Sequence, residues 1–117
     1  MIKKMYSPMG KQVGYIEDGV YISDRDFNKN QIFYTPKYKN AMGLSILIIK
    51  QLLQNNVGKV KFRVFNFEPK MFFAEISLKN FLKNSIDIKF NAKNSDRQKI
   101  VPMECFTKVY PGQKRLK

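Results

Sequence analysis

Residues 13–23 have the pattern of a β-hairpin, with two short apolar-rich stretches on either side of Asp18 and Gly19. Both of these residue types tolerate the positive φ angles that a two-residue hairpin turn requires. Pairing across the turn places alternate side chains on opposite faces. One face would carry Val13, Tyr15, Val20 and Ile22, and the other Gly14, Ile16, Tyr21 and Ser23. Residues 24–31 are polar and predict a loop, followed by a short strand at 32–34.

Apolar residues at helical spacing predict a long helix over residues 39–54. The segment starts after Pro36 and stops before the Asn-Asn-Val-Gly sequence at 55–58, a typical C-terminal signal. Two neighbouring apolar stripes run along it, formed by Met42, Ile46, Ile49 and Leu53 and by Ala41, Leu44, Ile48 and Leu52. Leu47 falls within the narrow polar stripe. We expect this helix to form the centre of the core; a strand over 45–49 is the alternative.

Strict alternation over residues 59–67 predicts a strand with two different faces. Val60, Phe62 and Val64 lie on one face, and Lys59, Lys61, Arg63, Phe65 and Phe67 lie on the other. A turn at 68–70 leads into a returning strand at 71–76. Its faces would carry Phe72, Ala74 and Ile76 on one side and Met71, Phe73 and Glu75 on the other.

The remaining C-terminal pattern is less regular. Ser77 can cap a short helix at about 78–84, and residues 86–90 alternate as a strand. A loop is expected at 91–98 and a last extended segment at 99–109, in which Pro102 suggests an edge or a bulge.

These elements predict an α+β fold with a mostly antiparallel sheet, built from two β-hairpins plus C-terminal strands. The sheet would pack on one long apolar helix (about 39–54) and one short helix (about 78–84). The length of 117 residues and a hydrophobic content of 44% fit one globular domain. We expect that domain over residues 1–110, with a basic flexible tail at 111–117.

The net charge of the chain is the strongest indication of the kind of partner it binds. The chain has 22 Lys and Arg against 9 Asp and Glu, for a net charge of +13, and it contains no histidine. Such a charge attracts polyanions, of which nucleic acid is the commonest. An acidic protein surface is an alternative partner. The composition of an AT-rich genome is another explanation, because 18 of the cations are lysines and Asn, Ile and Phe are abundant.

The outer face of the 59–67 strand is the best-supported candidate site, because it places cations beside aromatic rings. This arrangement suits single-stranded nucleic acid, whose bases stack on rings while lysines and arginines meet phosphates. The predicted nucleic-acid-binding residues are Lys59, Lys61, Arg63, Phe65, Phe73, Lys114, Arg115 and Lys117. The alternative is a second small core formed by Phe65, Phe67 and Phe73.

No catalytic residue, metal ligand or cofactor is predicted, and we expect a protein that is not an enzyme. Without histidine, the usual hydrolase triads and most general acid–base sites are excluded. A metal-dependent nuclease is the enzymatic alternative, built on Glu17, Asp18, Asp24, Asp26 and Asp87 with Lys89. Against it, the hairpin turn accounts for Asp18, while Asp24 and Asp26 flank Arg25 and can pair with it.

The favoured function is therefore a small nucleic-acid-binding protein that contacts the phosphate backbone with little sequence specificity. The alternative is a protein-interaction module or inhibitor, of viral or mobile-element origin, that covers an acidic or nucleic-acid-binding surface of another protein. The choice between DNA and RNA, and the oligomeric state, stay open.

The single cysteine, Cys105, has no internal disulfide partner and is expected to be a buried, inert thiol. The N-terminus lacks the apolar stretch of a signal peptide. The longest apolar run, at 46–49, is far shorter than the roughly 20 residues of a membrane span. We expect a cytoplasmic protein in a reducing environment with no membrane partner.

Overall fold

The computed structural model describes residues 1–28, 41–67, 70–91 and 96–111. Its fold is α+β, as expected, with nine strands and two α-helices among these residues. The strands are β1 (Ile2–Tyr6), β2 (Gln12–Glu17), β3 (Val20–Asn28), β4 (Ala41–Ser45), β5 (Lys59–Phe67), β6 (Lys70–Ser77), β7 (Ile86–Asn91), β8 (Asp96–Pro102) and β9 (Lys108–Pro111). The helices are α1 (Ile46–Gln54) and α2 (Leu78–Asn84), and a short 3₁₀ helix covers Met103–Cys105.

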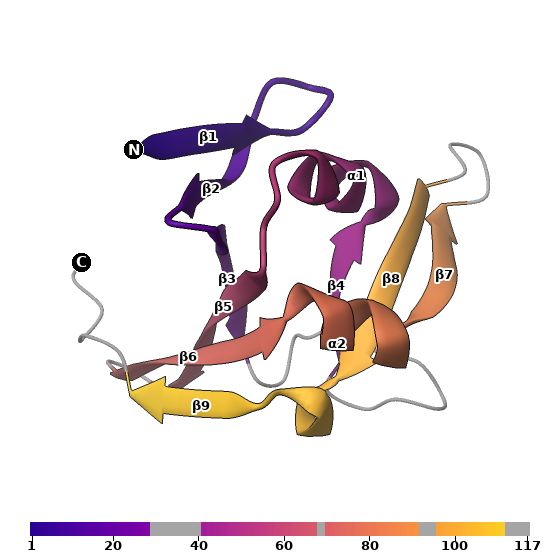
Figure 1. The fold of residues 1–117 in the computed structure, drawn as a ribbon. Helices are drawn as coiled ribbons and strands as arrows, with labels where there is room; N and C mark the ends of the chain where they lie inside the picture. Colours follow the sequence, from indigo (N-terminus) through magenta and orange to yellow (C-terminus); the bar gives the residue numbers. More distant parts are fainter. Residues whose placement is uncertain (29–40, 68–69, 92–95, 112–117) are drawn as a thin grey trace.

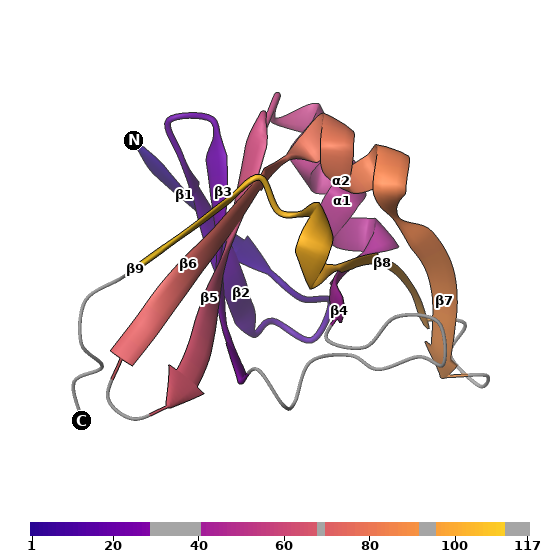
Figure 2. The same ribbon diagram turned by 90° about the horizontal axis from the view of Figure 1, so that it is seen from below.

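The strands form two sheets rather than the single sheet expected from the sequence. The larger has the order β1-β2-β3-β5-β6-β9, and the smaller has the order β4-β8-β7. All neighbouring strands are antiparallel except β3 and β5, which run parallel. Both helices and the three-stranded sheet lie on the same side of the six-stranded sheet (Figures 1 and 2). Among the described residues, no helix covers its opposite face.

The turn between β2 and β3 lies at Asp18 and Gly19, with φ angles of 52° and 77°. These values match the positive φ angles of a tight hairpin turn. Alternation divides the hairpin as the sequence suggests, because Gly14, Ile16, Tyr21 and Ser23 are buried while their neighbours are more exposed. The strand β3 continues to Asn28, because pairing with β5 extends it, so the loop expected at 24–31 is wrong over residues 24–28. Residues 29–31 lie outside the described part of the chain.

The long helix expected at 39–54 is wrong in its first part, because residues 41–45 form strand β4. Ser45 ends the strand and caps α1, its hydroxyl accepting a hydrogen bond from the Ile48 N–H at 3.2 Å. The first four residues of β4 are all buried, although among the described strands it pairs with β8 alone. A strand buried on both faces is apolar without a break, so periodicity alone cannot distinguish it from a buried helix. The alternative strand at 45–49 is also wrong.

Within α1, exposure separates two leucines from the buried helical face. Ile49 is 4% exposed, whereas Leu47 and Leu53 are 45% and 53% exposed. Leu47 thus lies on the solvent side, as its place in the polar stripe suggests. Leu53 lies outside the buried stripe to which the sequence assigned it.

We predict that Ile49→Ala lowers the free energy of unfolding by about 2–5 kcal/mol, as truncation of buried aliphatic side chains does. Leu47→Ala should cost less than about 1 kcal/mol, because its side chain is already half in water. Urea unfolding of the two variants measures the difference. Equal losses without any change in oligomeric state would contradict this assignment of the helix faces.

The C-terminal third differs from the single extended segment expected at 99–109. Strand β8 already begins at Asp96 and ends at Pro102, the 3₁₀ helix follows, and β9 starts at Lys108. Helix α2 begins after Ser77, whose hydroxyl accepts from the Asn80 N–H at 3.1 Å, as the capping signal predicts. The strand β1 was not foreseen, and the strand expected at 32–34 lies outside the described residues.

The core lies between the six-stranded sheet on one side and the two helices and the smaller sheet on the other. It holds buried side chains from all three, including Tyr21, Val60, Phe62, Ile76, Ile48, Leu52, Phe81, Met42 and Val101. Cys105 packs against this core but is only half-buried. Desolvation raises the pKa of its thiol, and the negative charge of Glu104 raises this pKa further. Among the described residues, neither helix has the length and apolar character that a membrane-crossing helix needs.

Candidate nucleic-acid interface

The strand registers place one row of side chains across all six strands of the larger sheet. Directly paired residues of neighbouring strands point to the same face, so the register follows this row from edge to edge. Its members are Lys4, Tyr15, Ile22, Lys61, Glu75 and Lys108. None of them is buried, whereas Val60 and Phe62, the neighbours of Lys61 in β5, are fully buried against the helix side. This row therefore defines the outer face of the sheet.

Next to this row, Phe73 and Tyr110 form a pair on β6 and β9. Their ring centroids are 5.8 Å apart, with the planes tilted by 30°. The Lys61 Nζ lies 5.9 Å from the Phe73 ring and 5.4 Å from the Tyr110 ring. The Lys108 Nζ lies 5.0 Å from the Tyr110 ring. These four residues are called the aromatic–lysine cluster below, and their distances are those of cation–π contacts.

One carboxylate lies beside the cluster. Glu75 forms an ion pair with Lys59 at 3.3 Å, with 13% and 60% of the respective side chains exposed. The Tyr110 hydroxyl also donates to Glu75 Oε2 at 3.5 Å. The carboxylate therefore orients Lys59 and Tyr110, and Lys4, Lys61 and Lys108 remain as further cations on the outer face.

The environment of Lys61 favours its charged form. The pKa of Lys61 is raised, mainly by a hydrogen bond with Tyr110. Partial burial lowers this pKa, and the nearby charge of Glu75 raises it further. Lys61 is therefore held in its charged form, with its ammonium group over the rings of Phe73 and Tyr110.

The structure brings four predicted site residues to one face, namely Lys59, Lys61, Arg63 and Phe73, since Arg63 pairs directly with Phe73. Arg63 has a different role, because its guanidinium donates to the backbone carbonyl of Asp24 and so links β5 to β3. The side chain of Phe65 and the tail cations Lys114, Arg115 and Lys117 lie outside the described residues. Phe73 is half-buried beside Tyr110 on the outer face, and the alternative of a small core with Phe65 and Phe67 stays untested.

Sequence reasoning missed Tyr15, Lys108 and Tyr110 as members of this face. Tyr15 belonged to a recognised hairpin face, but nothing local indicated which face was open. Lys108 and Tyr110 are two residues apart, the spacing of one strand face. Their place beside Phe73 depends on the pairing of β9 with β6, which the local pattern does not encode.

The acidic residues considered for a nuclease site do not converge where the structure describes them. Asp24 accepts a hydrogen bond from Gln12 Nε2 at 2.6 Å. Asp87 pairs with Lys99 at 2.7 Å, and this hydrogen bond lowers the pKa of its carboxyl group. No group of three or more His, Cys, Asp or Glu side chains is arranged to hold a metal ion in the described part of the chain.

A comparison with known protein families, curated protein sequences and solved structures gave no match to this chain.

Proposed function

We propose that this protein is a non-enzymatic binder of single-stranded nucleic acid and that the outer face of the six-stranded sheet is its binding surface. The observation that carries the proposal is the aromatic–lysine cluster on a face that no described helix covers. Lysines would meet phosphates, and the rings would offer stacking surfaces for bases. The net charge of +13 would add long-range attraction.

The cluster favours single strands over duplexes because its aromatic rings can stack only on bases that are accessible. In a duplex the base faces are already stacked on one another, whereas single-strand binders combine a cationic surface with aromatic platforms. Phe73 and Tyr110 lie side by side on neighbouring strands, so they could receive neighbouring bases.

Little sequence specificity is expected from this chemistry. Lysine acts mainly as a point charge toward phosphates, whereas the planar fork of arginine binds guanine with two hydrogen bonds of fixed geometry. The arginine on this part of the sheet, Arg63, is engaged with the Asp24 carbonyl. Stacking is also tolerant of sequence, because every base has a π face.

Fluorescence anisotropy with a labelled single strand and its duplex, from about 50 to about 200 mM salt, tests the proposal. We expect tighter binding of the single strand, and log affinity should fall with log salt by about 0.7 for each phosphate contacted. Absence of binding at the lowest salt would contradict the proposal and favour an acidic protein as the partner.

The stacking role of Tyr110 can be tested separately. Tyr110→Leu removes the aromatic plane and should weaken single-strand binding by about 1–3 kcal/mol, roughly 5- to 150-fold. Tyr110→Phe is the matched control, because it keeps the ring and loses only the hydroxyl, which contacts Glu75 and Lys61. Equal losses in both variants would show that the hydroxyl, rather than stacking, matters.

A further inference from the structure

The described strands leave four sheet edges, and these edges differ in how well a further strand could pair with them. β1 and β9 are the edges of the larger sheet, and β4 and β7 are the edges of the smaller one. An edge strand presents backbone N–H and C=O groups without a partner, so it can continue the sheet into another chain unless its side chains prevent this.

The edges of the larger sheet carry features that oppose pairing with a second copy. β1 has two adjacent exposed lysines, Lys3 and Lys4. β9 is four residues long, carries the exposed Lys108 and ends with Pro111, which has no backbone N–H. Charges of one sign, short length and proline are the means by which edge strands avoid unwanted pairing.

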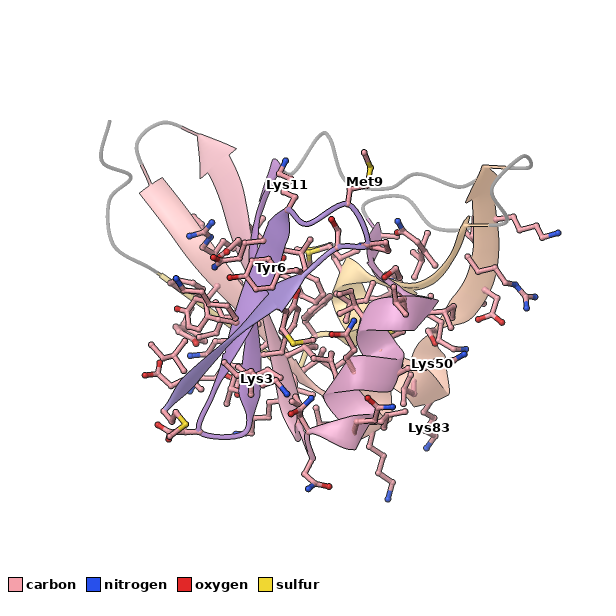
Figure 3. The ribbon with its side chains drawn as sticks, turned by 90° about the horizontal axis from the view of Figure 1, so that it is seen from above. Lys3, Tyr6, Met9, Lys11, Lys50 and Lys83 are labelled. Carbon is pink, nitrogen blue, oxygen red and sulfur yellow. The ribbon has the colours of Figure 1, made fainter. Side chains whose placement is uncertain are left out.

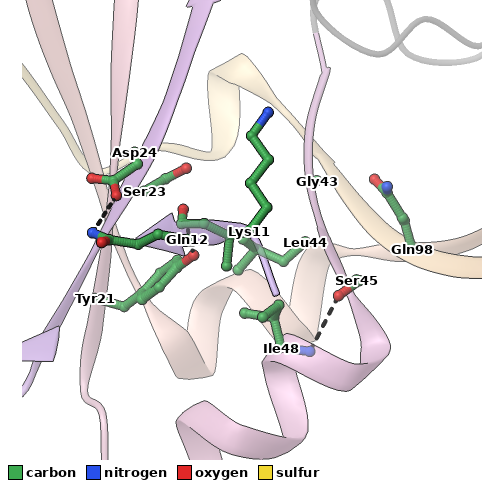
Figure 4. A pocket seen from close by; sticks show the side chains of 11 residues that line it. Lys11, Gln12, Tyr21, Ser23, Asp24, Gly43, Leu44, Ser45, Ile48 and Gln98 are labelled. Carbon is green, nitrogen blue, oxygen red and sulfur yellow. Dashed lines mark hydrogen bonds between the residues drawn. The ribbon is translucent and has the colours of Figure 1, made fainter. Parts of the chain in front are cut away.

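The β4 edge of the smaller sheet faces the larger sheet. Its first four residues are buried. Leu44 and Ser45 line a cleft of about 450 Å³ whose opposite wall carries Gln12 and Tyr21 from β2 and β3 (Figure 4). This edge therefore lies inside the molecule. β7 lies on the other side of β8, at the periphery in both Figures 1 and 2.

β7 carries opposite charges on either side of an isoleucine. Asp87 and Lys89 are exposed, and Ile88 between them is half-buried. If two β7 strands pair antiparallel with Ile88 opposite Ile88, Asp87 of each copy lies opposite Lys89 of the other, and such opposite-charge pairs stabilise a sheet. Centring the pair on Asp87 or on Lys89 would instead place like charges opposite each other. The charges therefore favour one register.

The surface beside β7 also lacks a carboxylate that a second copy would supply. Lys89 lies directly opposite Arg97 on β8, and like charges in this position repel. Neither cation forms an ion pair with a described residue. Asp87 Oδ1 accepts from Lys99 Nζ at 2.7 Å, and its second oxygen can accept from another cation. Asp87 of a second copy would thus lie beside Lys89 and offset its repulsion with Arg97.

We propose that β7 pairs antiparallel with β7 of a second copy, centred on Ile88, and joins the two smaller sheets into one continuous sheet. The contact is one strand wide and smaller than the roughly 1,200–2,000 Å² of a stable interface. We therefore expect a weak dimer, with a dissociation constant on the order of 10 μM to 1 mM. No member of the aromatic–lysine cluster takes part, so the proposal does not depend on the proposed function.

Sedimentation equilibrium of the wild-type protein from about 10 μM to about 1 mM measures this association. We expect the average mass to rise from monomer towards dimer. In ¹H–¹⁵N NMR spectra over the same range, the amide signals of residues 86–90 should shift with concentration. A monomer at every concentration would overturn the proposal, and so would a dimer whose formation leaves these signals unchanged.

Two charge variants test the register. Lys89→Glu places carboxylates at positions 87 and 89, and Asp87→Lys places lysines at both. Each variant alone would bring like charges together twice, so its self-association should weaken at least about tenfold. An equimolar mixture should associate again, because the two variants complement each other at every charged position. Circular dichroism should show that both fold, since the exposed pair of Asp87 and Lys99 contributes little stability.

Lys11→Glu is the matched control, because it makes the same charge change as Lys89→Glu at an exposed position in the turn between β1 and β2. It should associate like the wild type. Wild-type association in both β7 variants would show that another surface forms the dimer. Folded variants that remain monomeric when mixed would show that Asp87 and Lys89 do not meet. Either result would overturn the proposal.

Discussion

Replacing Phe62 with alanine should lower the free energy of unfolding by about 3–5 kcal/mol, as truncation of a buried phenylalanine does. Phe62 lies on β5, is completely buried, and contacts two other rings. Its centroid is 6.3 Å from that of Phe81 on α2 and 5.6 Å from that of Phe106, which follows the 3₁₀ helix. One side chain therefore joins the six-stranded sheet, the second helix and the C-terminal segment. The expected loss is a large part of the roughly 5–15 kcal/mol that stabilises a typical domain.

Urea unfolding followed by circular dichroism measures this loss. Phe62→Leu is the matched control and should cost less, because leucine fills much of the space that alanine leaves empty. If Phe62→Ala cost under about 1 kcal/mol, the three rings would not form the packed junction described above.

Neutralising two lysines of the outer face should weaken single-strand binding by roughly tenfold or more. Lys61→Gln with Lys108→Gln removes both cations of the aromatic–lysine cluster and leaves the Lys59–Glu75 ion pair in place. The slope of log affinity against log salt should become shallower by about 0.7 for each phosphate that the variant no longer binds. Fluorescence anisotropy over a range of salt concentrations measures both quantities.

The matched control removes the same charge from the opposite side of the molecule. Lys50 on α1 and Lys83 on α2 lie on the helix side (Figure 3), so Lys50→Gln with Lys83→Gln should keep the salt slope of the wild type. Equal weakening in both double variants would mean that net charge alone drives binding, without a defined face. Arg63 is unsuitable for this test, because its bond to the Asp24 carbonyl couples any substitution to the fold.

The sequence predicted those elements whose signals are local. The hairpin turn follows from Asp18 and Gly19, helix α2 follows from the Ser77 cap, and the two faces of β5 follow from strict alternation. It failed for residues 41–45, where burial on both faces of β4 imitates the apolar content of a helix. The same limit applies to β1, an edge strand with only one buried side chain, Met5.

The residues of the candidate site could also be predicted from the sequence only in part. Lys61 and Phe73 could be placed together from sequence because one short hairpin joins their strands. Tyr15 and Tyr110 could not, since their strands reach the same face only through pairings between distant parts of the chain.

The parallel contact between β3 and β5 has a consequence for how the binding surface forms over time. Each flanking hairpin can close within microseconds, because its pairing is local. The β3–β5 contact must first bring together strands separated by the chain that contains β4 and α1, and closing such a loop costs conformational entropy before any contact repays it. Tyr15 belongs to one hairpin, whereas Lys61 and Phe73 belong to the other. We therefore expect the outer face to be assembled late in folding, when two preformed hairpins join.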